Sequence, residues 1–265
     1  MSSRLDVALV ERGLARSRGQ AAAFIDSGVV TVAGRLVEKA SQRVEPDDEI
    51  LVTTPDHYVS RGAHKLLAAL DAFAVDPAGA LALDAGASTG GFTQVLLERD
   101  AREVIAVDVG HGQLAPSIAI DGRVRSFEGV NIRDLDRVVL ARLTGSDALP
   151  SLLVADLSFI PLSLALPPLA AVSAEGADLI LLIKPQFEVG RLGVKEGIVR
   201  DPGLRIDAIS RVLWSAWDVG LGPAGIIVSP LVGGAGNKEF LVHLRSGAGD
   251  PSALIRDVVT LPFVS

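Results

Sequence analysis

The sequence contains no cysteine among its 265 residues, which excludes several kinds of chemistry at once. Disulfide bonds, thiolate zinc sites, cysteine-held iron–sulfur clusters and cysteine nucleophiles all require this side chain. Aromatic residues are also few, at 4% of the chain. The chain is nevertheless 49% hydrophobic, so it can bury a core without covalent staples.

A long unbroken apolar run is absent as well. Residues 157–174 carry no charge, but Pro161, Pro167 and Pro168 interrupt them. We therefore expect a buried helix with its approach loop there, rather than a membrane span. Charged residues, beginning with Arg4, stand where an export signal would need an apolar run. The sequence therefore predicts a cytoplasmic protein with no part in a membrane.

The chain carries 25 basic and 32 acidic residues, a formal net charge of −7. This balance excludes a basic coat over the whole surface, although it allows a local basic site. Residues 1–65 contain nine basic and nine acidic side chains, so the whole excess of acid lies in the rest of the chain. A neutral, arginine-rich head on an acidic body indicates two modules with different partners, with chance as the alternative.

Residues 1–54 predict a small α+β module. Apolar spacing indicates a helix over residues 4–13. The sequence SRGQ is a capping pattern that begins a second helix over residues 17–28. Short strands are expected at residues 29–32 and 50–53.

A linker over residues 55–61 leads into a larger domain over residues 62–265. There, apolar strand segments alternate with stretches that suit helices. This alternation predicts an α/β fold with a parallel sheet covered by helices on both faces. One helix contains Trp214 and Trp217, and we expect both rings to lie in the core. The strands are expected at residues 80–84, 103–108, 124–127, 152–156, 178–183, 225–229 and 240–244.

The strongest local motif is LDAGASTGGFTQVLLE at residues 83–98, where a strand leads through a turn of small residues into a helix. Glycines let the backbone approach a ligand, and the start of the helix presents free N–H groups. The spacing matches neither the dinucleotide fingerprint nor a P-loop. With Asp84 before the turn and Asp108 at the end of the next strand to hold a ribose diol, the motif suits a cofactor such as S-adenosylmethionine. A tight turn without a ligand is the alternative.

Only five of the 25 basic residues are lysines, and one of them ends an apolar strand. Lys184 follows LILLI and Asp156 ends LLVAD, so both lie at carboxyl ends of strands, where open α/β sheets bind ligands. The two side chains could therefore face each other across one crevice. A lysine acts as a base only when its pKa falls toward neutrality, which burial favours and a carboxylate opposes. A lone structural ion pair is the alternative.

Four segments, VSRGAHKL, LDAGASTGGFTQVLLERDAREVIAVDVGHGQL, LLVADLSFIPL and LLIKPQFEVG, resemble the TlyA family. The resemblance covers nearly the whole chain. It implies a ribosomal RNA 2′-O-methyltransferase of the FtsJ-like class, a family often described as haemolysins. The implied fold is a Rossmann-like class I methyltransferase domain preceded by a small S-four-type (S4) RNA-binding domain. S-adenosylmethionine is the implied cofactor, and a cytidine of ribosomal RNA or of a ribosomal subunit is the implied substrate.

The resemblance also implies site residues. A catalytic tetrad would consist of Lys65, Asp156, Lys184 and Glu239, with Lys184 deprotonating or steering the 2′-hydroxyl. The cofactor would contact the glycine-rich loop, its neighbouring acids and one residue at the adenine edge, namely Asp84, Gly86, Ser88, Thr89, Gly90, Gly91, Phe92, Asp108, Asn131 and Asp156. In the S4-type module, RNA phosphates would be bound by Arg4, Arg16, Arg18, Arg43 and Arg61.

Missing motifs narrow the reaction further. Without cysteine, pyrimidine C5 methylation through a cysteine nucleophile and radical methylation are excluded, and no Asp/Asn-Pro-Pro-aromatic motif for exocyclic amines occurs. Methylation of an oxygen by direct displacement remains. The histidines fit no metal site, so we expect no metal, and we favour a monomer. The linker departs from the family form in Asp56, His57 and Tyr58. A membrane-lytic protein and a non-catalytic RNA-binding protein are the competing hypotheses.

Overall fold

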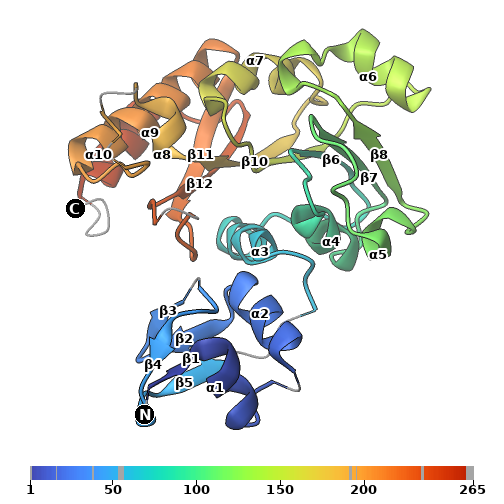
Figure 1. Ribbon diagram of the computed structural model, residues 1–265. Helices are drawn as coiled ribbons and strands as arrows, with labels where there is room; N and C mark the ends of the chain where they lie inside the picture. The colour runs from blue at the N-terminus through green and yellow to red at the C-terminus, as the bar shows by residue number, and fades with distance from the viewer. Residues whose placement is uncertain are drawn as a thin grey trace. The chain divides into compact units, whose positions relative to one another are not determined.

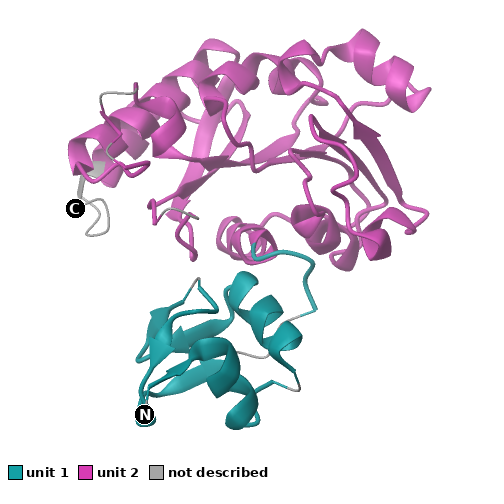
Figure 2. Ribbon diagram, viewed as in Figure 1, with its two compact units in different colours: residues 1–61 teal, residues 62–265 magenta. Residues whose placement is uncertain are grey.

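The computed structural model describes residues 2–15, 17–37, 39–52, 57–190, 193–194, 196–233 and 236–260. The chain divides into two compact units, residues 1–61 and residues 62–265 (Figure 2). Each unit contains a cluster of buried hydrophobic side chains of its own.

The first unit combines short helices with short antiparallel strands (Figure 1). Its helices are α1 (Leu5–Glu11) and α2 (Arg18–Asp26). Among the described residues, β1 (Ser3–Arg4) pairs with β4 (Arg43–Val44), and β2 (Val30–Val32) lies between β3 (Arg35–Leu36) and β5 (Ile50–Val52).

The helices of this unit differ from the predicted ones mainly at their ends. Arg4 belongs to β1, so the helix predicted over residues 4–13 begins only at Leu5. The predicted capping pattern of the second helix is confirmed, because Ser17 Oγ accepts a hydrogen bond of 3.2 Å from Gln20 N. Such a cap satisfies one of the N–H groups that the first turn of a helix leaves without a partner.

The core of the first unit forms where both helices pack against the strands. Leu5 of α1, Ile25 of α2 and Val30 of β2 are each exposed by 1% or less. Burying a side chain of this size contributes about 1.5–3 kcal/mol relative to leaving it in water. This packing leaves Arg4 and Arg18, at the beginnings of the two helices, on the surface.

The second unit is built on a sheet with helices on both faces. Its strands are β6 (Leu81–Ala85), β7 (Glu103–Asp108), β8 (Val124–Glu128), β9 (Leu152–Ala155), β10 (Asp178–Ile183), β11 (Leu221–Val228) and β12 (Phe240–Ser246). Its helices are α3 (Gly62–Phe73), α4 (Gly91–Glu98), α5 (Pro116–Ala119), α6 (Arg137–Thr144), α7 (Leu162–Ala171), α8 (Pro185–Glu188), α9 (Pro202–Asp218) and α10 (Pro251–Thr260), with a 3₁₀ turn η1 (Ile132–Asp134). Helices α3 and α4 cover one face of the sheet, and α7, α9 and α10 cover the other (Figure 1).

The predicted parallel sheet is present over β10, β9, β6, β7 and β8, and one strand near the other edge, β12, departs from it. Across the described residues the strand order is β11-β12-β10-β9-β6-β7-β8. β12 runs antiparallel to both β10 and β11, whereas the pairs from β10 to β8 are parallel. The reason lies in the short, glycine-rich connection from β11 to β12 over residues 229–239, whose described residues contain no helix. A connection without a crossover joins antiparallel neighbours.

The prediction for Trp214 and Trp217 is also wrong. Both lie on α9, and their side chains are 43% and 42% exposed. The 3.6-residue repeat of the helix places Ile209, Val212 and Leu213 toward the sheet, so the two rings point away from the core. The helix expected within residues 157–174 is α7, whose apolar side is buried as predicted.

The strand order creates a crevice at the carboxyl ends of the central strands. β6 has β9 on one side and β7 on the other, so the chain leaves β6 and β9 in opposite directions. In open α/β sheets, ligands bind at such a point. The glycine-rich motif follows β6, and Asp156 follows β9, so both lie at this edge.

Candidate active site

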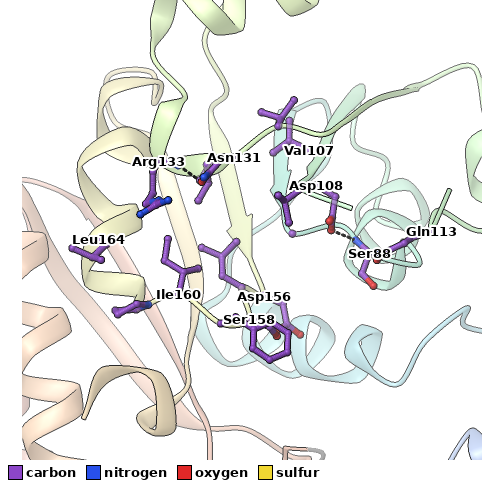
Figure 3. Close-up of a pocket in the computed structure, with 17 residues that line it drawn as sticks. Ser88, Val107, Asp108, Gln113, Asn131, Arg133, Asp156, Ser158, Ile160 and Leu164 are labelled. Carbon is purple, nitrogen blue, oxygen red and sulfur yellow. Dashed lines mark hydrogen bonds between the residues drawn. The ribbon is translucent and has the colours of Figure 1, made fainter. Parts of the chain in front are cut away.

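A cavity of about 560 Å³ opens at the crevice (Figure 3). Its walls come from the loops that follow β6, β7, β8 and β9. Of the predicted cofactor contacts, five line it: Gly86, Ser88, Asp108, Asn131 and Asp156. Residues that the sequence reasoning did not single out line it too, among them Val107, Gln113, Arg133, Ser158, Phe159 and Leu164.

Gly86 makes the close approach of two loops possible. Its φ is +79°, in the region that favours glycine. A Cβ atom at this position would lie 3.0 Å from the carbonyl oxygen of Asp156 and 3.1 Å from Cδ2 of Leu157. A larger residue would therefore push the loop after β6 away from the loop after β9 and open the floor of the cavity.

Asp108 is held in place by backbone amides. Its Oδ2 accepts a hydrogen bond of 2.8 Å from Ser88 N (Figure 3). Its Oδ1 accepts one of 2.7 Å from Gly110 N. An ionised carboxylate has about four acceptor positions, so two remain for a ligand. The geometry is suited to accepting hydrogen bonds from a diol.

Asn131 lines the cavity from the loop after β8. Its Oδ1 accepts a hydrogen bond of 3.1 Å from Arg133 N, which caps η1 (Figure 3). The cap leaves the donor side of the amide for other partners.

The other predicted cofactor residues do not line the cavity. Asp84 is fully buried, and its Oδ2 accepts a hydrogen bond of 2.6 Å from Thr93 Oγ1. Its Oδ1 has no hydrogen-bond partner among the described residues. Burial raises the pKa of Asp84 to about 7, and the hydrogen bond from Thr93 opposes this rise. Also outside the cavity wall are Thr89, Gly90, Gly91 and Phe92, which form the turn into α4 and its first residues.

The four predicted tetrad residues form one network of alternating charges. Lys184 Nζ lies 2.6 Å from Asp156 Oδ1, and Lys65 Nζ lies 3.6 Å from Asp156 Oδ2 and 2.7 Å from Glu239 Oε2. The residues come from α3, the loop after β9, the end of β10 and the start of β12. The two positive and two negative charges balance, which is what burial of ionised groups requires. A lone Asp156–Lys184 ion pair is therefore the wrong description of this site.

The network is supported from both ends. At one end, Lys184 Nζ donates a hydrogen bond of 2.8 Å to Ser158 Oγ on the cavity wall. At the other end, a Cβ atom on Gly233 would collide with the Glu239 carboxylate, so the glycine makes room for it. Asn237, which is 1% exposed, accepts a hydrogen bond from Val199 N and fixes the approach to β12.

Glu188 is a buried acid that sequence reasoning missed. It ends α8, which follows Lys184, and it accepts hydrogen bonds from Leu162 N and Ser163 Oγ at the start of α7. It thereby ties the segment that carries Lys184 to the segment that follows Asp156. Burial raises the pKa of Glu188. The only sequence signal was an acid within the apolar segment LLIKPQFEV.

The predicted RNA-binding arginines belong to the first unit. The structure describes all of them except Arg16. Arg4 and Arg18 both bind the Asp6 carboxylate. Arg43 Nη1 donates a hydrogen bond of 3.1 Å to the carbonyl oxygen of Ser2. The side chain of Arg61 packs against Gly28.

The altered linker is described only in part. Asp56 lies outside the described residues. The rings of His57 and Tyr58 lie with their centroids 4.2 Å apart.

Comparison with known proteins identifies the family. A family model for FtsJ-like methyltransferases matches residues 58–246, more than half of the chain. The chain belongs to the FtsJ-like methyltransferase family. A second model, for the S4 domain, matches residues 3–50 of this FtsJ-like methyltransferase. The resemblance and the fold class predicted from the sequence are therefore confirmed.

Relatives of this FtsJ-like methyltransferase extend over nearly its full length. It is 45% identical to the 16S/23S rRNA (cytidine-2′-O)-methyltransferase TlyA of Mycobacterium tuberculosis, over 92% of this chain and 90% of that protein. It is 36% identical to Hemolysin A of Brachyspira hyodysenteriae, over 91% of this chain and 98% of that protein. A solved structure of a hemolysin-named protein from Streptococcus thermophilus is 36% identical, covers 97% of this chain and 94% of its own, and has a TM-score of 0.75.

Two features are absent from the described residues of the FtsJ-like methyltransferase. In the part of the chain that the structure describes, no three or more His, Cys, Asp or Glu side chains are grouped so that they could hold a metal ion. No helix in that part is both long enough and apolar enough to cross a membrane.

Proposed function

We propose that this chain transfers a methyl group from S-adenosylmethionine to the ribose 2′-hydroxyl of a cytidine in ribosomal RNA. The observation that carries the proposal is the network of Lys184, Asp156, Lys65 and Glu239 beside the cavity. The name of the 45% identical relative, which acts on cytidine 2′-oxygens of 16S and 23S rRNA, supports the same substrate. Because ribosomes are in the cytoplasm, a ribosomal substrate would place the protein there as well.

The residues at the cavity suit S-adenosylmethionine. Gly86 and Ser88 would offer backbone close to the methionine part, Asp108 would hold the ribose hydroxyls, and Asn131 would bind the adenine edge. Asp156 would bind the cofactor's amino group. The buried residues Asp84, Gly90, Gly91 and Phe92 would shape the loop from behind, and the exposed Thr89 would complete its turn. When bound, the cofactor supplies a methyl group activated by a positively charged sulfur.

Lys184 is the residue that would contact the reacting hydroxyl. As the bond from the 2′-oxygen to the methyl carbon forms and the carbon–sulfur bond breaks, the hydroxyl must lose its proton. Lys184 would accept that proton after its ammonium group has released one of its own to solvent, while Asp156 and Ser158 hold its amino group in place. Lys65 and Glu239 would fix Asp156 from behind. Holding two bound reactants in line can supply about 7–11 kcal/mol of the rate acceleration.

The two parts of the chain would have different tasks. Residues 1–54 would bind RNA, residues 55–61 would link, and residues 62–265 would carry the reaction. The match of residues 3–50 to the S4 domain supports the first of these assignments. Arginines on an RNA-binding unit act mainly on phosphates, and the five proposed contacts are Arg4, Arg16, Arg18, Arg43 and Arg61. The protein would act as a monomer.

The test is methyl transfer from tritiated S-adenosylmethionine to isolated small and large ribosomal subunits. The modified ribose is mapped by reverse-transcription stops at low nucleotide concentration. We expect one strong stop at a cytidine, which Lys184→Ala abolishes while cofactor and RNA affinities stay within about 3-fold. Arg256→Ala, on the exposed side of α10, is the control for loss of a positive charge. Cofactor binding without transfer to either subunit would overturn the substrate assignment, and near-normal turnover of Lys184→Ala would overturn the role of the lysine.

A further inference from the structure

Asp6 is a buried acid that joins two exposed arginines in the first unit. Its side chain is 7% exposed, whereas the side chains of Arg4 and Arg18 are 44% and 63% exposed. Arg4 donates from Nε at 2.9 Å and from Nη2 at 3.3 Å, and Arg18 donates from Nε at 3.1 Å and from Nη2 at 2.7 Å. One carboxylate therefore holds both guanidinium groups by the same edge, and Nη1 of each takes no part in these bonds.

The arrangement also links three elements of the unit. Arg4 ends β1, Asp6 lies in the first turn of α1, and Arg18 is the first residue of α2. The hydrogen bonds from Arg4 and then Arg18 lower the pKa of the Asp6 carboxyl to about 2, so it stays ionised at neutral pH. The cluster carries two positive charges and one negative charge, which leaves one net positive charge for a partner.

We propose that Asp6 is a positioning residue that holds Arg4 and Arg18 as a paired guanidinium fork for a backbone phosphate of the substrate RNA. This inference rests on the proposed function, because it takes ribosomal RNA as the partner. A guanidinium group offers planar pairs of N–H donors that match phosphate oxygens. A free arginine side chain loses much of its conformational freedom when it binds, whereas a side chain already held by Asp6 loses less.

The proposal predicts a change in RNA affinity on Asp6→Asn that is opposite to the change expected from net charge alone. Asp6→Asn removes a negative charge from the RNA-binding unit, and an added net positive charge ordinarily strengthens binding to nucleic acid. However, an asparagine has one acceptor oxygen with two lone pairs and no charge, so it cannot accept the four hydrogen bonds by which Asp6 holds the two guanidinium groups. If Asp6 acts by positioning, Asp6→Asn must weaken RNA binding in spite of the favourable change in charge.

The experiment compares two full-length variants that make the same change in charge. Asp6→Asn is measured beside Asp26→Asn, which alters an exposed acid at the end of α2. Binding to isolated ribosomal subunits and the kinetics of methyl transfer are followed over a series of salt concentrations. We expect Asp6→Asn to weaken RNA binding about 5- to 10-fold and to raise KM for RNA much more than it lowers kcat. Asp26→Asn should bind as tightly as wild type or more tightly.

A second pair of variants separates positioning from folding. In an Arg4→Ala/Arg18→Ala background, Asp6 has no guanidinium groups left to hold, so adding Asp6→Asn should no longer weaken binding. An equal loss in that background, or RNA binding by Asp6→Asn as tight as that of wild type, would overturn the proposal. Wild-type protein in the same assay separates the role of Asp6 from the proposed function. If wild type failed to methylate any subunit, the proposed function would be overturned and not the role of Asp6.

Discussion

Each unit of this protein has an acid between two cationic side chains, but the two units differ in the type of cation and in its exposure to solvent. In the first unit Asp6 binds Arg4 and Arg18, whose side chains are 44% and 63% exposed. In the second unit Asp156 lies between Lys184 and Lys65, each with a side chain only 11% exposed.

The choice of residue follows from the task. Arginine stays charged in proteins and binds phosphates through a rigid fork, so it suits a surface that must hold RNA. A lysine in a sheltered site can give up and take back a proton, so it suits chemistry. The same local geometry is therefore suited to binding in one unit and to catalysis in the other.

Exchanging the two kinds of cation is the strongest way to break this comparison. Lys184→Arg keeps a positive charge beside Asp156 but removes a group that can accept a proton, so we expect kcat to fall by about 10²- to 10⁴-fold. Arg18→Lys keeps the charge beside Asp6 and loses only the fork, so RNA binding should weaken by roughly 5-fold. Single-turnover transfer and subunit binding measure the two effects. Comparable losses in both variants would show that the difference between the units is not functional.

The next largest effect should be a loss of stability when the buried Lys65–Glu239 ion pair is broken. Glu239→Gln leaves Lys65 with Asp156 alone, at 3.6 Å, and breaking a buried pair costs about 3–5 kcal/mol. Urea unfolding should show this loss. The matched control is Glu103→Gln, which breaks a half-exposed pair with Arg125 and should cost about 0–1 kcal/mol. Equal costs for the two variants would mean that the network is not sheltered from water.

The burial of Asp84 predicts that the free energy of unfolding of the second unit depends on pH. Burial raises its pKa to about 7 in the folded protein, above the value near 4 of an exposed aspartate, so the folded state binds more protons between these limits. Its contribution to stability is therefore present below pH 4 and is lost as the pH rises toward 7, by as much as about 4 kcal/mol. Asp84→Asn should remove this loss. The unfolding free energy of the variant minus that of wild type should increase from pH 4 to pH 8; a flat difference would contradict the burial effect.

How far the site could be predicted depends on the distance in sequence between its parts. The turn after β6 and the cap at Ser17 were predictable, because a few neighbouring residues determine them. The contacts of Lys65 with Glu239, and of Glu188 with Leu162, join residues far apart in the chain. Spacing carries no information about such pairs; the resemblance to a family suggested the first, and nothing suggested the second.

The same reasoning explains the errors in the fold. The apolar segment of β12 predicted a strand but not its direction, since direction depends on how residues 229–239 return the chain to the sheet. Trp214 and Trp217 are large and hydrophobic, which favours burial, yet the helix they belong to already turns its other side to the sheet. Residue type alone was therefore a weaker guide than helical position.

The smallest predicted effect is a loss of stability in the first unit that leaves RNA binding by its arginines unchanged. Ile25→Val removes one methylene from the core at the far end of α2 and should lower the stability of the unit by about 0.5–1.5 kcal/mol. It leaves Asp6 and its two arginines untouched, so affinity for ribosomal subunits should stay within about 2-fold of wild type. Thermal unfolding and subunit binding are measured on the same sample. If Ile25→Val weakened RNA binding as much as Asp6→Asn does, the affinity of this unit would depend on its general stability. If it did not, the affinity would depend on the side chains that its fold holds at the surface.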